Sequence, residues 1–231
     1  INNAAREPEI SALADFLNSA GANIKGAGSN VITIEGVKKL YGTVCRVIPD
    51  RIEAATFMAA AAVTGGDVTL KNDYTPHLQS IPEAFELIGC KIDAAEHTLR
   101  IKAPARLQAI PYIKSQVYPA FPTDAGPLIT AALATADGTS VFVEGIFENR
   151  YRYISELQRL GADIKIEGRA AIVRGKERLC GAPCVCTDLR GGAALAVAAL
   201  GAEGVTILDD TRHIDRGYGR FAEKLSLIGA Q

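Results

Sequence analysis

Four similar phrases recur along this chain, and their spacing constrains the fold more than any other feature. The phrases are LNSAGANI, FELIGCKI, LQRLGADI and LSLIGAQ, and their glycines are Gly21, Gly89, Gly161 and Gly229. Neighbouring glycines are about 70 residues apart, a period that indicates a duplicated structural unit. Each phrase is typical of the last turn of an amphipathic helix with a glycine just beyond it.

The first part of each unit predicts a helix and then strands. Pro8 stands where a first-turn proline is tolerated, and the apolar residues that share one helix face after it are Ile10, Leu13, Ala14 and Leu17. The third helix repeats this spacing with Ile154, Leu157 and Leu160. The alternating runs NVITIEG, TLRIKA and AIVRG follow the first three glycines, and each predicts a strand with one buried face.

The second part of each unit predicts a helix that is buried on all sides. The three alanine-rich runs are DRIEAATFMAAAAVTGG, DAGPLITAALATADG and DLRGGAALAVAALGAEG, and each precedes a further strand. The unit therefore reads helix, strand, strand, helix, strand, repeated about three times. We expect an α/β fold of α+β repeats, in which small sheets surround buried helices.

Composition excludes several classes of function. The 231 residues carry a formal net charge of −1, so no general basic field attracts nucleic acid or an anionic membrane. No apolar run reaches the roughly 18 residues of a membrane-spanning helix. The odd number of cysteines and the lack of a signal peptide favour the reducing cytoplasm. The first residue is Ile1 rather than methionine, so we expect a fragment or a processed piece.

Three of the five cysteines lie close together in the run LCGAPCVC, as Cys180, Cys184 and Cys186. A zinc site would need ligands at finger-like spacing, but no CxxC pair is present and His213 is the one later histidine. The favoured reading is that Val185 and Cys186 lie on a strand and that the thiols pack as small apolar residues. We expect neither a metal nor a cofactor.

Each of the three buried helices opens on an aspartate: Asp50, Asp124 or Asp188. Such a residue ordinarily caps the helix, and Glu53 suggests a capping box after Asp50. Asp124 differs because prolines and a glycine surround it in PAFPTDAGP, fixing a turn that presents the carboxylate. It is a candidate general base, although its reference pKa of about 3.9 means that positioning must supply much of the effect.

Arg150, Arg190 and Arg216 each stand where a helix is expected to begin. Guanidinium groups beside the free N–H groups of a helix start suit a phosphate or a carboxylate. The alternative, an Asp–Arg pair on a surface turn, stays open at this point. No GxxxxGK[ST], GxGxxG or GxSxG motif is present to suggest other chemistry.

The stretches PAFPTDAG, IFENR, TDLRGG and HIDRGY occur in order along the chain. Together they resemble the enolpyruvyl transferases, most closely the UDP-N-acetylglucosamine branch of that family. The resemblance implies an inside-out α/β fold of two similar domains, each built from three units around a helical centre. Residues 1–47 would then be the remainder of the first domain, and residues 48–231 most of the second, with three repeats.

The resemblance also implies a reaction. The family moves the enolpyruvyl group of phosphoenolpyruvate onto the 3′-hydroxyl of UDP-N-acetylglucosamine and releases phosphate, the first committed step of peptidoglycan synthesis. Asp124 would be the base near that hydroxyl, and the nucleotide sugar would lie along Ile146 and Phe147, with Arg150 close by. The phosphoenolpyruvate anion would be held by Arg190 and Arg216.

The other half of the family's site, with a lysine, an arginine and a cysteine acid, would lie upstream of Ile1, in a missing N-terminal domain. A closing strand would follow Gln231. We therefore expect this polypeptide alone to be inactive, with open sheet edges that favour self-association. Two other readings remain: a relative of 3-phosphoshikimate enolpyruvyl transferase, and a non-catalytic binding protein on the same fold.

Overall fold

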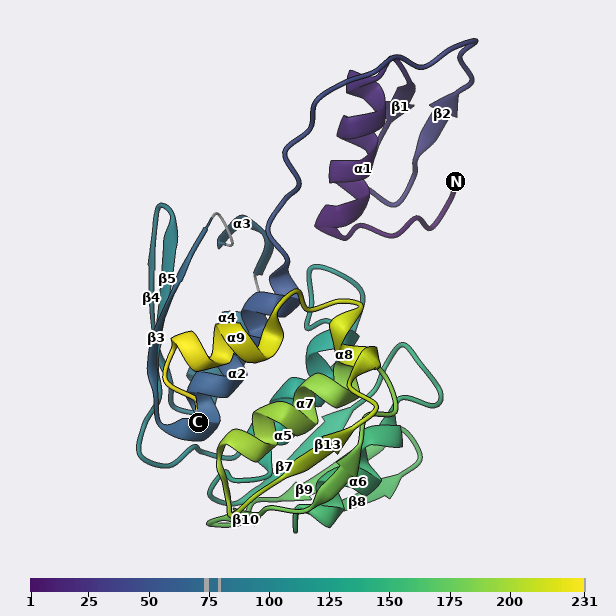
Figure 1. Cartoon of the computed structure of the whole chain (residues 1–231). Helices are drawn as coiled ribbons and strands as arrows, with labels where there is room; N and C mark the ends of the chain where they lie inside the picture. Colours follow the sequence, from purple (N-terminus) through teal and green to yellow (C-terminus); the bar gives the residue numbers. More distant parts are fainter. Residues whose placement is uncertain (73–74, 79, 231) are drawn as a thin grey trace.

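Three buried helices form the centre of the larger unit (Figure 1). In the computed structural model, which describes residues 1–72, 75–78 and 80–230, they are α2 (Arg51–Thr64), α5 (Gly126–Leu133) and α7 (Leu189–Leu200). Each of the three packs against the other two. Every residue of α5 is buried, and α2 and α7 expose little more than their ends. Their alanine-rich sequences allow this because small side chains let helices approach closely.

Small sheets surround these helices. The three-stranded antiparallel sheet has the order β3-β5-β4, from β3 (Asp67–Lys71), β4 (Lys91–Ala95) and β5 (Thr98–Lys102). The four-stranded sheet has the order β6-β7-β9-β8, from β6 (Ile113–Lys114), β7 (Thr139–Val143), β8 (Asp163–Glu167) and β9 (Ala170–Arg174). Two parallel pairs complete the set: β10 (Leu179–Cys180) with β12 (Ala202–Glu203), and β11 (Pro183–Val185) with β13 (Ile207–Asp209).

Shorter helices connect the sheets to the centre. They are α3 (Thr75–Leu78), α4 (Ser80–Leu87), α6 (Ile154–Arg159), α8 (Arg212–Asp215) and α9 (Phe221–Leu227), with the 3₁₀ turns η1 (Thr123–Ala125) and η2 (Tyr151–Tyr153). The four repeat glycines all have φ between 90° and 101°, which confirms that one backbone turn recurs after each helix. Glycine is favoured there because a side chain is strained at positive φ. The predicted α/β fold of repeats around buried helices is therefore confirmed.

A smaller unit stands apart from this body (Figure 1). It contains α1 (Pro8–Ser19) and the antiparallel pair β1 (Asn23–Lys25) and β2 (Thr33–Glu35), and a segment without regular structure, residues 36–50, leads from it to α2. The predicted buried face is only partly formed here: Ala14 of α1 and Ile32 before β2 are buried, but Leu13 is 53% exposed and all three residues of β2 are exposed. No layer of described residues covers these apolar side chains. The division of the chain into domains at residue 47 stays a prediction.

None of the described helices has both the length and the apolar character needed to cross a lipid bilayer.

Candidate functional site

Asp124 does not cap the helix that follows it. It lies inside η1, and the N-cap residue of α5 is Ala125, without a side-chain hydrogen bond. The other two aspartates are caps, as predicted: Asp50 accepts two backbone N–H groups at the start of α2, and Asp188 accepts two at the start of α7. Only half of the capping box forms: Asp50 accepts the Glu53 N–H, but the Glu53 carboxylate accepts a bond from Lys224.

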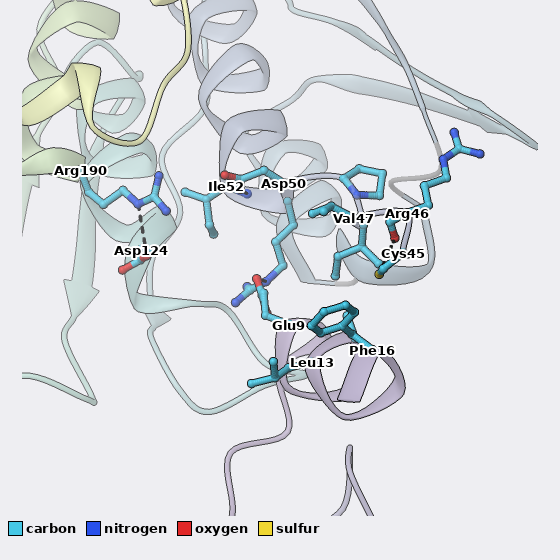
Figure 2. A pocket seen from close by; sticks show the side chains of 14 residues that line it. Glu9, Leu13, Phe16, Cys45, Arg46, Val47, Asp50, Ile52, Asp124 and Arg190 are labelled. Atoms are coloured by element: carbon cyan, nitrogen blue, oxygen red, sulfur yellow. Dashed lines mark hydrogen bonds and ion pairs between the residues drawn. The ribbon is translucent and has the colours of Figure 1, made fainter. Parts of the chain in front are cut away.

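The Asp124 carboxylate lies between two guanidinium groups that come from different parts of the chain. Arg150 Nη2 donates to Oδ1 at 2.7 Å, and Arg190 Nε donates to Oδ2 at 3.2 Å. Figure 2 shows the second of these contacts beside the start of α2. The side chains of Arg150 and Arg190 are only 21% and 14% exposed, which excludes a simple surface pair. The carboxylate is held in one orientation at the edge of a cleft.

A second contact fixes Arg190 from its other side. Its Nη1 donates to the Tyr218 hydroxyl at 3.0 Å, and the guanidinium lies 5.4 Å from the centre of the Tyr218 ring. Because the Thr56 hydroxyl donates to a backbone carbonyl, Tyr218 must donate in turn to Thr56 on α2. Burial opposes the charge of Arg190, but Tyr218 and Asp124 raise its pKa above the usual value. The guanidinium is therefore both charged and held in place.

Arg216 is placed differently from the prediction. It follows the last residue of α8 instead of beginning a helix, and its side chain is exposed. Within the described residues, Arg216 forms no ion pair. It lines a cavity of about 300 Å³ whose charged lining residues are Asp124, Arg150, Arg152, Asp188, Arg190 and Arg216. Four arginines against two aspartates give this cavity an excess of positive charge, which suits an anion.

Ile146 and Phe147 lie on the loop after β7, and this loop leads to Asn149 and Arg150 in the lining of the cavity. Their side chains are partly exposed, and their backbone N–H groups both donate to Glu144 Oε1, at 2.7 and 3.1 Å. The Arg150 guanidinium lies 5.4 Å from the centre of the Phe147 ring. The structure thus brings Phe147 into contact with Arg150, which in turn holds Asp124.

Sequence reasoning missed Glu144 and Tyr218. A signal for Glu144 was present, because Ser140, Phe142 and Glu144 continue the period of two that marks the buried face of β7. A carboxylate on the core side of a strand is unusual and indicates a specific set of hydrogen bonds. Tyr218 stands in the HIDRGY stretch, but nothing in that stretch indicates its contact with α2.

A larger cleft of about 750 Å³ lies on the other side of the Asp124–Arg190 pair. Figure 2 shows Glu9, Leu13 and Phe16 of α1 along one wall, and Asp50 and Ile52 at the start of α2 along another. The segment around Val47 closes the cleft between them. Asp124 and Arg190 line both cavities, so the pair stands where the two open spaces meet.

The model of the EPSP synthase family (3-phosphoshikimate 1-carboxyvinyltransferase) matches residues 1–225. The chain belongs to this family. Its curated relatives within the family include UDP-N-acetylglucosamine 1-carboxyvinyltransferase 1 of Caldanaerobacter subterraneus subsp. tengcongensis, 51% identical over 231 residues. The protein of the same name from Symbiobacterium thermophilum is 50% identical over 230 residues. These matches cover 100% of the chain but 55% and 52% of the relatives, so the chain spans about half their length.

The solved structures agree on the family fold. The enolpyruvyl transferase NikO from Streptomyces tendae superimposes with a TM-score of 0.88 at 24% identity, covering 100% of this chain and 55% of that one. EPSP synthase from Acinetobacter baumannii gives a TM-score of 0.71 at 22% identity over 94% of this chain. At these identities the comparison shows the fold alone.

The prediction for the clustered cysteines is partly confirmed: Val185 ends β11, as expected of a strand residue, but Cys186 follows the strand instead of lying on it. Cys184 and Cys186 are fully buried, whereas Cys180 is exposed. Burial raises the pKa of Cys186 to about 11, so its thiol stays neutral near neutral pH. No group of three or more histidine, cysteine or acidic side chains within the described part of this family member is arranged to hold a metal ion.

Proposed function

We propose that this chain supplies half of the active site of an enzyme that transfers the enolpyruvyl group of phosphoenolpyruvate to the 3′-hydroxyl of UDP-N-acetylglucosamine. The observation that carries the proposal is the Asp124 carboxylate, held by Arg150 and Arg190 at the edge of a positively charged cavity. The names of the relatives support this choice of substrates. The reaction would be the first committed step of peptidoglycan synthesis.

In the proposed reaction, Asp124 takes the proton of the sugar hydroxyl while the hydroxyl oxygen attacks C2 of phosphoenolpyruvate. In the same addition step, a proton adds to C3 of phosphoenolpyruvate. In the elimination step, the C2–O bond to phosphate breaks and the proton leaves C3, while the new C–O bond to the sugar remains. The products are the enolpyruvyl ether and phosphate. Because a carboxylate is a weak base, the fixed orientation of Asp124 between two guanidinium groups supplies the main advantage.

The arginines would hold the anionic substrate. Arg190 is fixed by Tyr218 and Asp124, and Arg216 is exposed at the same cavity and forms no ion pair with a described residue. A planar guanidinium binds a carboxylate or phosphate through two parallel hydrogen bonds, so lysine would be a weaker substitute at either position. Ile146 and Phe147 would lie along the nucleotide sugar.

The upstream half of the site would come from a further domain, and the location would be the cytoplasm. All five cysteines are free thiols, which supports a reducing compartment. Within the described residues, β3 and β4 are the edge strands of their sheet, and we propose that such edges let the isolated chain self-associate. Sedimentation of the chain at several concentrations tests this, and a monomer throughout would contradict it.

The deciding experiment measures phosphate release from phosphoenolpyruvate in the presence of UDP-N-acetylglucosamine. The full gene product, including whatever precedes Ile1, is compared with the 231-residue chain. We expect turnover from the longer protein alone, because the chain spans only about half the length of its relatives. Asp124→Ala should lower kcat by about 10²- to 10⁴-fold, the usual contribution of a general base.

Asp137→Ala is the matched control, because Asp137 also pairs with an arginine but is 61% exposed and lines neither cavity. Turnover by the short chain would overturn the half-site proposal. Activity with shikimate 3-phosphate instead of the sugar nucleotide would move the chain to the other branch of its family. A longer protein that is inactive with both acceptors would favour a non-catalytic binding role.

A further inference from the structure

Glu144 is an acidic side chain that the fold buries almost completely. It is 1% exposed, and no lysine or arginine among the described residues pairs with its carboxylate. Burying an ionised carboxylate without a cation is costly unless several donors satisfy it. Four donors surround it: the hydroxyls of Ser115 and Thr123 and the backbone N–H groups of Ile146 and Phe147.

These four donors belong to three separate segments, and two of these segments line the charged cavity, one through Asp124 and the other through Asn149 and Arg150. Ser115 follows β6, Thr123 lies in η1 directly before Asp124, and Ile146 and Phe147 begin the loop that leads to Arg150. The carboxylate therefore joins the turn that carries the candidate base to the loop expected along the nucleotide sugar.

The two carboxylate oxygens serve different segments. Oε1 accepts from the Ser115 hydroxyl at 2.7 Å and from the two loop N–H groups, whereas Oε2 accepts from the Thr123 hydroxyl at 2.7 Å. Tyr151 adds further support, since its hydroxyl accepts the Glu144 N–H and donates to neighbouring backbone carbonyls. Because each oxygen contacts a different segment, a substitution can remove the hydrogen bond to Thr123 without removing those to the 146–147 loop.

We infer that Glu144 is a positioning residue, which orders the 146–147 loop through Oε1 and orients the Asp124 turn through Oε2. The expected effects of Glu144 on KM and kcat rest on the proposed function. The ordering of the loop by Glu144 is a property of the fold and does not depend on that function. Glu144 itself contacts no substrate, because its side chain is enclosed by the protein.

The first test needs no catalysis and uses amide hydrogen exchange in the 231-residue chain. Glu144→Ala removes the oxygen that accepts both loop N–H groups, so the Ile146 and Phe147 amides should exchange at least about tenfold faster, as an opened hydrogen bond allows. Glu144→Gln keeps an oxygen at the Oε1 position and should retain most of the protection. Thr123→Val should leave these two amides unchanged, because it removes only the Oε2 contact.

The second test uses steady-state kinetics of the full gene product to separate the ordering of the 146–147 loop from the orientation of the Asp124 turn. Glu144→Ala should raise KM for UDP-N-acetylglucosamine by about tenfold or more, since its loop is no longer ordered for binding. Thr123→Val should lower kcat by about tenfold with little change in KM, because a small misplacement of a base is enough to cost that factor. Thr123→Ser restores the hydroxyl and should restore kcat.

The inference is overturned if Glu144→Gln behaves like Glu144→Ala in amide exchange, or if neither change affects exchange at the loop. It is also overturned if Thr123→Val and Thr123→Ser lower kcat equally. A parent protein without turnover refutes the proposed function alone. In that case the exchange result still decides whether Glu144 orders the loop.

Discussion

At the scale of single residues, the site depends on contacts that join distant parts of the chain. Arg190 lies in the first turn of α7, but its guanidinium is fixed by Asp124 from η1 and by Tyr218 from the segment after α8. Tyr218 is in turn anchored by Thr56 on α2. A substitution at any of these positions therefore disturbs the others, and their effects should not add independently.

The five thiols provide a residue-scale prediction. Cys45 and Cys180 are exposed, whereas Cys90, Cys184 and Cys186 are buried. Burial raises the pKa of Cys90 and Cys186 from 9.0 to about 11, so neither forms a thiolate near pH 8. A thiol reagent at pH 8 should modify two cysteines in the folded chain and all five in denaturant. Rapid reaction of more than two would contradict the structure.

The same pKa shifts set the direction of a pH effect. Folding raises the pKa of these thiols, so the folded protein holds their protons more tightly than the unfolded chain does. This difference stabilises the folded state relative to its stability at a pH where the thiols are ionised. That contribution is complete below pH 9.0 and is lost as the pH rises toward about 11, where the folded protein must ionise buried thiols. Denaturant unfolding at pH 8 and pH 10 should show lower stability at the higher pH, and less difference in Cys90→Ala.

The sequence allowed part of the site to be predicted at this scale. Asp124 stood out because prolines and a glycine surround it, and the structure confirms that it escapes the capping role of Asp50 and Asp188. Arg216 was misplaced by a few residues because α8 ends just before it. Tyr218 could not be predicted, since its partner Thr56 is far away in the sequence and no local pattern links the two.

At the scale of elements, capping decides where the central helices begin. Asp50 Oδ1 accepts the backbone N–H groups of Ile52 and Glu53 at 2.8 and 3.1 Å. Asp50→Ala leaves these donors without a partner and should lower the free energy of unfolding by about 1 kcal/mol. Asp50→Ser keeps an acceptor and should recover most of that loss. Urea unfolding of the three proteins measures the difference, and equal stability of all three would contradict the capping role.

Elements were predictable where burial and local pattern agree. The three central helices and the strands β5 and β9 show the expected buried positions because neighbouring layers cover them. The periodicity of α1 and β2 is just as clear in the sequence, but α1 buries only Pro8 and Ala14, and β2 buries none of its residues. A pattern reveals which face is apolar, but it cannot reveal what covers that face.

At the scale of the whole molecule, two units meet across the larger cleft. The Arg51 side chain at the start of α2 is only 10% exposed, and its Nε donates to Glu9 on α1 at 2.9 Å. The Arg51 guanidinium also lies 5.8 Å from the centre of the Tyr118 ring. Asp124 and Arg190 line the same cleft as Glu9 and Leu13 of α1, so the small unit forms part of the wall beside the candidate site.

The Glu9–Arg51 contact should therefore control how often the cleft opens. Glu9 is 52% exposed, so solvent weakens the pair, and a value of about 1 kcal/mol is the upper range for such contacts. Glu9→Ala should then raise the population with separated units by about fivefold. A pair of spin labels, one on α1 and one on α2, should show the population at the longer distance rise by a similar factor. Asp15→Ala removes the same charge from α1 without breaking a described ion pair, so an equal rise in both variants would mean that the contact does not hold the units together.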